Sequence, residues 1–198
     1  MPFIIAAILG GIVGLLRGGQ FNNLTHLPIR WSALPLLALG FQIYVLYGPG
    51  RDEAGRFGLP ALLILASYGL LFVAVLVNRR LPGMMWLGLG SALNFLVILA
   101  NGGWMPVTAE LLVTAGFVNT PEAVVPGQRV LFSKDVVMVS QEMHLGWLSD
   151  RFVLPKAGPF TMVFSAGDVL MMLGLFRVVQ AGMLNLVGQA LENADHAV

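Results

Sequence analysis

"GLPALLILASYGLLFVAVLV", residues 58 to 77, decides the fold class of this chain because about 20 consecutive residues contain no charged side chain. At about 1.5 Å per residue, a helix of this length crosses a hydrocarbon layer roughly 30 Å thick. A membrane-barrel strand would instead alternate apolar and polar residues over about ten positions. The stretch therefore predicts a membrane-spanning helix.

The whole chain has the same apolar character. Of its 198 residues, 57% are hydrophobic and 11% are charged, whereas soluble domains carry about 25% charged residues. The mean hydropathy is +0.82. We predict an all-α, polytopic membrane helix bundle, formed as a single integral membrane domain over residues 1–198, with an outward-facing, partly helical cap over 101–158. The five predicted spans are 2–17, 31–48, 58–77, 82–100 and 159–180.

Charge and cysteine content exclude several functions. The formal net charge is +1, so no strong positive field predicts binding to nucleic acid. The chain has no Cys, which excludes disulfides, thiolate metal sites, iron–sulfur clusters and thiol nucleophiles. We predict no metal site and leave the cofactor open. The expected partners are the lipid bilayer and other membrane protein subunits.

Basic residues in the connections predict the orientation in the inner, cytoplasmic membrane, because short cytoplasmic loops are rich in Lys and Arg. One side carries Arg17, Arg30, Arg79, Arg80 and Arg177. The other side carries Arg51, Arg56, Arg129, Lys134, Arg151 and Lys156, partly offset by Asp52 and Glu53. Because the first group lies in the shorter loops, we predict that the N-terminus is outside and the C-terminus inside.

Small residues recur every four positions in the first span, at Ala6, Gly10 and Gly14. They lie on one helix face, where small side chains let the backbones of two membrane helices come close together. This face is predicted to pack against another helix.

The stretch "NGGWMPVTAE", residues 101 to 110, predicts the end of the fourth span. Asn101 and the two glycines can form a left-handed helix cap and a sharp turn. Trp104 is then expected at the depth of the lipid headgroups, and Thr108 is expected to cap a short helix that ends at Ala115. Alternatively, the glycines let backbone amides contact a ligand, which makes Asn101 a candidate binding residue.

A second stretch of the cap, "KDVVMVSQEMHLGWL" at 134 to 148, has apolar residues at spacings of three and four. These are Val136, Val139, Met143 and Trp147. The pattern predicts an amphipathic helix that lies in the interface or covers the bundle.

Asp168 is the acid with the strongest functional interpretation, because a carboxylate inside a membrane span is costly. It has a structural alternative. Ser165 stands three residues earlier, and this spacing matches a capping box in which each side chain bonds the backbone amide of the other residue. The last helix would then begin near Ala166 after an extended segment from Pro159 to Phe164.

Three other polar residues are candidates for binding a ligand or ion. Gln42 and Asn94 lie within spans, where they either form interhelical hydrogen bonds or line a polar path. His144 stands near Glu142 and Asp150, but the spacing matches no zinc-protease motif. No catalytic residue is predicted.

The segments "ANGGWMPVTAE" at 100 to 110 and "VFSAGDVLMMLGLF" at 163 to 176, with "LGWLSDRFVLPKAG" at 145 to 158 between them, resemble a family of small bacterial multi-helix membrane proteins known only as a domain of unknown function. In that family the middle segment has a Gly-Asp pair, whereas this chain has Ser149 before Asp150. The resemblance implies an architecture and supplies no activity.

Three functions follow as hypotheses. The first is a non-enzymatic accessory or structural component of a membrane assembly, based on the small-residue face of the first span. The second is a small transporter or channel that uses a polar site near Asp168 and Asn101. The third is a membrane enzyme in which His144 acts with Glu142 or Asp150.

Overall fold

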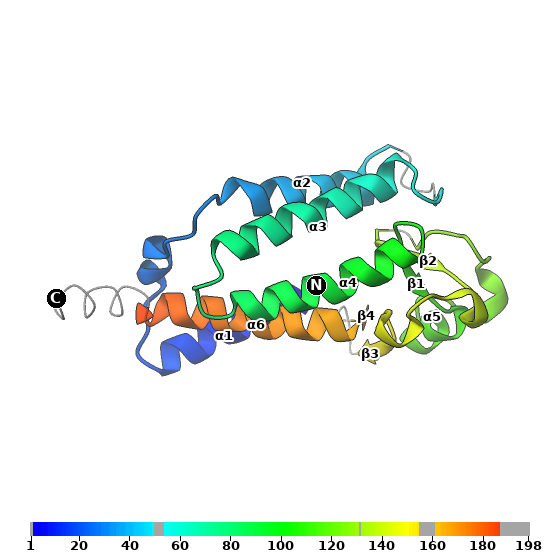
Figure 1. Ribbon diagram of the computed structural model, residues 1–198. Helices are drawn as coiled ribbons and strands as arrows, with labels where there is room; N and C mark the ends of the chain where they lie inside the picture. Colours follow the sequence, from blue (N-terminus) through cyan, green and yellow to red (C-terminus); the bar gives the residue numbers. More distant parts are fainter. Residues whose placement is uncertain (1, 50–53, 131, 155–160, 187–198) are drawn as a thin grey trace.

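Five long helices form an arc in the computed structural model, and a mixed cap covers one end of it (Figure 1). The structure describes residues 2–49, 54–130, 132–154 and 161–186. Arg51, Asp52, Glu53 and Lys156, which enter the predicted orientation, lie outside these ranges, as do Pro159 and Phe160. The long helices are α1 (Pro2–Leu16), α2 (Ala33–Tyr47), α3 (Leu59–Val77), α4 (Met84–Ala100) and α6 (Ala166–Met183).

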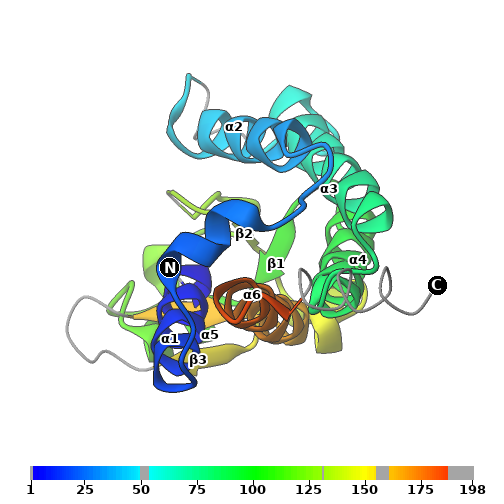
Figure 2. The same cartoon turned by 90° about the vertical axis from the view of Figure 1, so that its left-hand side faces the viewer.

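The spatial order of the helices differs from their order in the chain. α2 packs on α3, α3 on α4, α4 on α6, and α6 on α1. Figure 2 shows the arc from the end opposite the cap, with α2 and α1 at its two ends. These two helices share no comparable packing among the residues that the structure describes. The arc is therefore open between α1 and α2.

Each predicted span coincides in large part with one long helix, but the helices differ in length. α3 and α6 are long and apolar enough to cross a membrane, judged by length and composition. The apolar helices Phe3–Leu16, Ala33–Tyr47 and Met84–Ala100 are shorter. The last helix begins at Ala166 after the strand Met162–Phe164, so the predicted span beginning at 159 starts several residues too early.

Glycines bring α4 and α6 into backbone contact. A Cβ added at Gly174 would lie 2.6 Å from the backbone nitrogen of Leu87, and one at Gly90 would lie 2.8 Å from the backbone nitrogen of Met171. A Cβ at Gly167 would collide with the side chain of Asn94. Only glycine fits at these positions, because real Cβ atoms do not come so close to other atoms.

The small-residue face of α1 lies against α6. A Cβ at Gly10 would lie 2.9 Å from the carbonyl oxygen of Phe176, and one at Gly14 would lie 2.7 Å from the sulfur of Met183. Ala6 on the same face is buried. This face is therefore filled by a helix of the same chain.

The cap contains strands as well as helical turns. β1 (Met105–Val107) pairs in parallel with β2 (Asp135–Val137), and β3 (Phe152–Leu154) pairs antiparallel with β4 (Met162–Phe164). The helical elements of the cap are α5 (Ala109–Ala115) and the 3-10 turns η2 (Pro121–Ala123), η3 (Ser140–Glu142) and η4 (Gly146–Leu148). A further turn, η1 (Phe21–His26), lies between α1 and α2. The protein is thus mostly helical, and its two short sheets correct the all-α prediction.

The predicted amphipathic helix over 134 to 148 is wrong. The segment begins with β2 and continues through two separate 3-10 turns. Val136 is buried against the bundle, whereas Val139 and Trp147 are exposed. β-branched side chains at Val136 and Val137 favour a strand, and pairing with β1 overrides the helical spacing.

The turn after α4 joins the cap to the bundle. Gly102 and Gly103 have positive φ angles of 79° and 97°, while Asn101 does not adopt the left-handed conformation. Trp104 is only 1% exposed and its indole nitrogen donates to the carbonyl oxygen of Gly55. Trp104 therefore packs inside the protein instead of facing lipid headgroups, in a core cluster that contains residues of α2, α3, α4, β1 and β2.

We predict that Gly174→Ala destabilises the protein because its methyl group would push α4 away from α6. Gly69→Ala on α3 is the matched control, since its added Cβ would have no neighbour within 4 Å. Alanine favours a helix by about 1 kcal/mol over glycine, so the control should be neutral or stabilising. Thermal unfolding in detergent measures both, and equal midpoint temperatures would contradict the packing described for α4 and α6.

Candidate functional site

A large cavity occupies the open side of the arc, beneath the cap. Its volume is about 1060 Å³, which is at the upper end of the range of about 300–1,000 Å³ for small-molecule sites. Four of the long helices and the cap line it. The apolar part of the wall includes Phe3, Ala38, Leu39, Leu71, Met171 and Leu175.

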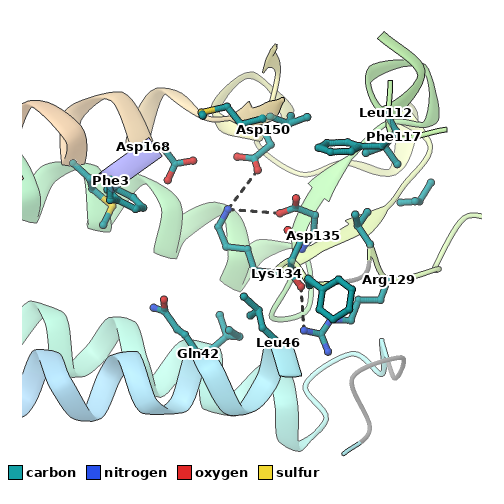
Figure 3. Close-up of a pocket in the computed structure, with 18 of the residues that line it drawn as sticks. Phe3, Gln42, Leu46, Leu112, Phe117, Arg129, Lys134, Asp135, Asp150 and Asp168 are labelled. Carbon is teal, nitrogen blue, oxygen red and sulfur yellow. Dashed lines mark hydrogen bonds and ion pairs between the residues drawn. The ribbon is translucent and has the colours of Figure 1, made fainter. Parts of the chain in front are cut away.

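Charged side chains gather at the cap end of this cavity. The ammonium nitrogen of Lys134 lies 3.4 Å from Asp150 Oδ2 and 3.6 Å from Asp135 Oδ1. Figure 3 shows Lys134 directed between these two carboxylates, with Asp168 on α6 facing the same region. The side chain of Lys134 is 23% exposed and that of Asp150 is 2% exposed. The site thus combines a long apolar wall with a buried charged end.

The lysine stays charged in this setting. Burial alone would lower the pKa of Lys134, but Asp150, Asp168 and Asp135 together raise it well above its ordinary value. Burial raises the pKa of Asp150 well above the usual aspartate range, and Lys134 offsets only part of that rise. One lysine therefore does not fully compensate the carboxylates that surround it.

Asp168 is held by the capping box that its spacing with Ser165 predicts. Its Oδ2 accepts from the backbone nitrogen of Ser165, and its own backbone nitrogen donates to Ser165 Oγ. Its Oδ1 accepts from Asn94 Nδ2 on α4 at 2.8 Å, and Asn94 Oδ1 accepts from Ser165 Oγ at 2.7 Å. The carboxylate thus caps α6, ties it to α4 and lines the cavity at the same time.

Three oxygen atoms of the cavity wall are buried without a hydrogen-bond partner in the described part of the chain. Asp150 Oδ1 and Thr161 Oγ1 have no hydrogen-bond partner among the residues that the structure describes. Asp135 Oδ1 likewise has only its ion pair with Lys134. Buried polar atoms are nearly always satisfied in folded proteins, so such atoms call for a partner.

Arg129 is a second cation of the cavity wall. One of its terminal nitrogens donates to the carbonyl oxygens of Val45 at 2.8 Å and Ser133 at 3.0 Å. Its guanidinium lies over the ring of Trp104, 4.5 Å from the ring centre. These contacts connect β2 and its preceding turn to α2 and the core of the cap.

The binding candidates named from the sequence do not all lie at one site in the structure. Gln42 and Asp168 line the cavity, and Gln42 donates to Ser67 Oγ between α2 and α3. Asn94 lies in the clamp with Asp168. The Asn101 side chain donates to the carbonyl oxygens of Val97 and His144 and accepts from the backbone nitrogen of His144. Asn101 therefore fastens the cap to α4 and does not line the cavity.

His144 is exposed, and Asp150 is paired with Lys134. Within the described ranges, no group of three histidine, aspartate or glutamate side chains is suited to hold a metal ion. The carboxylates of the cavity are gathered around an ammonium group instead.

Sequence reasoning missed the pairing of Lys134 with Asp150. The two residues are 16 positions apart. Lys134 directly precedes β2 and Asp150 lies in the turn before β3, so no helical or strand spacing connects them. The available signal was the presence of a Lys-Asp pair and a further Asp inside an otherwise apolar cap. Such charges are costly to bury unless they meet one another.

Fold and cavity together define a class: a mostly helical protein whose apolar helices surround a cavity with one charged end. The chain belongs to the family of unknown function DUF5317, whose model matches residues 26–180. The matched residues contain α2 to α5, α6 as far as Gln180, and every residue that lines the cavity except Phe3.

A relative from Thermotoga maritima, described as an uncharacterized protein, is 27% identical over 178 residues, which cover 88% of this chain and 85% of the relative. The comparison with solved structures gives no significant match. Neither comparison assigns an activity, so the cavity is the best guide to function.

We predict that Lys134→Met destabilises the protein by about 3 kcal/mol, because removing one partner of a buried ion pair leaves a carboxylate without its cation. Adding Asp150→Asn should recover much of this loss, since the uncompensated charge is then removed. Thermal unfolding of both variants in detergent measures the effect. A double variant no more stable than Lys134→Met would contradict the coupling of these two residues.

Proposed function

We propose that this protein is a membrane-embedded binding protein for an amphiphilic molecule. The apolar body of that molecule lies along the wall formed by α2, α3 and α6, and its polar head reaches the charged cluster around Lys134. The single observation that carries the proposal is the cavity of about 1060 Å³, which joins an apolar wall to buried charges.

The outer faces of the helices support a membrane location with five spans. They expose many large apolar side chains, a pattern that soluble monomers avoid. Among them are Ile4, Ile8 and Ile12 on α1, Leu36 and Ile43 on α2, Leu62 and Leu76 on α3, and Leu89 and Leu96 on α4. Helices shorter than a full span are accommodated when the bilayer thins locally or flanking side chains extend to the interface.

The arrangement of basic residues supports an orientation with the cap outside and the C-terminus in the cytoplasm. Arg17, Arg79 and Arg80 lie in the connections at the end opposite the cap. Arg129 and Lys134 on the cap side are turned into the protein. Because their charges are directed into the protein, these two residues contribute less to the basic charge of the cap-side loops. The excess of basic loop residues therefore lies at the end opposite the cap.

The opening between α1 and α2 supports entry from the lipid. Phe3 on α1 and Leu39 on α2 line the cavity from the two ends of the arc. A molecule with a hydrocarbon chain could pass between them without leaving the apolar phase. A water-soluble substrate would have no such advantage.

The other hypotheses have less support. The accessory-subunit hypothesis rested on the small-residue face of α1, the apolar cap and the lack of a catalytic motif in the sequence, and α6 of the same chain fills the small-residue face. The transporter hypothesis retains Gln42 and Asp168, which line the cavity. It loses Asn101, whose hydrogen bonds fasten the cap. The enzyme hypothesis pairs His144 with Glu142 or Asp150, but His144 and Glu142 are both exposed and Asp150 pairs with Lys134.

We predict that Leu39→Trp lowers the occupancy of bound amphiphile by about tenfold, equivalent to about 1.4 kcal/mol. The larger ring would extend into the apolar part of the cavity and narrow the space for a hydrocarbon chain. Leu37→Trp is the matched control, because Leu37 is on the same helix and similarly exposed (49% against 51%) but does not line the cavity. Native mass spectrometry of protein extracted from its own membrane in mild detergent measures the bound mass.

Wild type and Leu37→Trp should carry the same small-molecule mass, and Leu39→Trp should carry little of it. A wild-type protein without any bound amphiphile, or equal loading of both tryptophan variants, would overturn the proposal.

A further inference from the structure

Among the residues that the structure describes, the charged end of the cavity has one negative charge more than its cations compensate. The wall that these residues form contains three carboxylates and two cations. The carboxylates are Asp135, Asp150 and Asp168, and the cations are Arg129 and Lys134. A buried excess charge is costly unless another charge or a proton joins it.

The contacts of each charged side chain indicate where the excess negative charge lies. Asp168 accepts from Asn94 and Ser165 and lies at the positive end of α6, which stabilises its charge. Arg129 is directed to the carbonyl oxygens of Val45 and Ser133. Lys134 is then the cation shared by Asp135 and Asp150. The excess charge therefore lies at this last pair of carboxylates.

The same place contains oxygen atoms that can accept a hydrogen bond. Asp150 is almost fully buried, yet its Oδ1 has no hydrogen-bond partner among the described residues. Thr161 Oγ1, also in the cavity wall, likewise has no hydrogen-bond partner among the described residues. A group that brings both N–H donors and a positive charge would satisfy these atoms and the excess charge together.

We propose that the Asp150 end of the cavity binds the primary ammonium head of an amphiphile, whose N–H groups donate to Asp150 Oδ1 and Asp135 Oδ1 beside Lys134. This inference rests on the proposed function, since the hydrocarbon chain of the ligand occupies the apolar wall. The primary ammonium can belong to a simple alkylamine or to an aminolipid.

Other heads fit the site less well. A carboxylate head would add a negative charge beside three carboxylates, and Lys134, the one ammonium that the described residues place there, is already shared. A hydroxyl head could donate to Asp150 but would leave the excess charge in place. A quaternary ammonium would bring the charge without an N–H donor. The primary ammonium satisfies both requirements.

A proton competes with the ammonium for the same carboxylate. Burial raises the pKa of Asp150 well above the usual range. The ionisable groups around this end of the cavity are Lys134 just before β2, Asp135 on β2, Asp168 on α6 and Tyr68 on α3. As the pH falls through this raised pKa, Asp150 becomes neutral and loses its attraction for a cation. Binding of the ammonium should therefore weaken at acidic pH.

The test uses the full chain in nanodiscs of phosphatidylcholine, which contains no primary amine. Radiolabelled dodecylammonium, dodecanoate, dodecanol and dodecyltrimethylammonium share one chain and differ only in the head. Lysophosphatidylethanolamine is a fifth probe and represents an aminolipid. Equilibrium binding is measured at pH 8 and pH 5, and the partition into empty nanodiscs is subtracted.

We expect dodecylammonium to bind at least about tenfold more tightly than the other three dodecyl probes at pH 8, and less tightly at pH 5. Tighter binding of lysophosphatidylethanolamine than of dodecylammonium would identify an aminolipid as the source, and the reverse order would identify a free amine. Asp150→Asn should lower the affinity for dodecylammonium by at least about tenfold. Glu142→Gln, an exposed carboxylate of the cap outside the cavity, should leave it unchanged.

Thr161→Val is a second variant that leaves the ion pair intact, and it should weaken dodecylammonium binding without lowering the unfolding temperature. Equal binding of dodecanoate and dodecylammonium would overturn the ammonium site, as would an Asp150→Asn variant that folds and binds like wild type. If the probes bind equally but Leu39→Trp abolishes their binding, the proposed function survives and the ammonium site fails. If no probe binds above empty nanodiscs, both fail.

Discussion

The close contact between α4 and α6 is the constraint on which the other parts of the structure depend. Gly90, Gly167 and Gly174 let the two backbones meet, and Asn94 joins this contact to the Ser165–Asp168 capping box. α1 adds to the outer side of α6, while α3 and α2 continue from α4. Since α4 leads directly into the cap, the same contact places Asp168 opposite the cap residues Lys134 and Asp150. The cavity lies on the side of the arc where α1 and α2 do not pack on each other.

Local chemistry explains which parts of the fold could be predicted. The long helices follow from uninterrupted apolar runs, the α5 cap at Thr108 from a hydroxyl that accepts from Leu111, and the start of α6 from the spacing of Ser165 and Asp168. The two sheets could not be predicted, because three-residue strands carry too little periodicity. Val136 and Val139 matched a helical spacing by chance, but pairing with β1 places Val136 in a strand. Lys134 and Asp150 meet only through tertiary structure.

The charged end of the cavity carries a cost that the fold alone does not require. Apolar residues of similar size would fill this space without buried charges, and such replacements are often neutral or stabilising. Asp168 has a structural role that accounts for its burial. Asp150 has no such role: one of its oxygens bonds to Lys134 and the other has no hydrogen-bond partner among the described residues. A ligand that enters from the lipid with its polar head toward the cap accounts for both the apolar wall and the unsatisfied oxygen.

Photolabelling would test this account most directly. A dodecylamine with a diazirine near the end of its chain would be added to the protein in phosphatidylcholine nanodiscs and irradiated, and the labelled residues would be located by mass spectrometry. The account predicts labels on cavity-lining residues such as Leu39, Met171 and Leu175, and these labels should disappear when unlabelled dodecylammonium is added. Labels spread evenly over outward-facing residues such as Leu37 and Leu96, without competition, would contradict it.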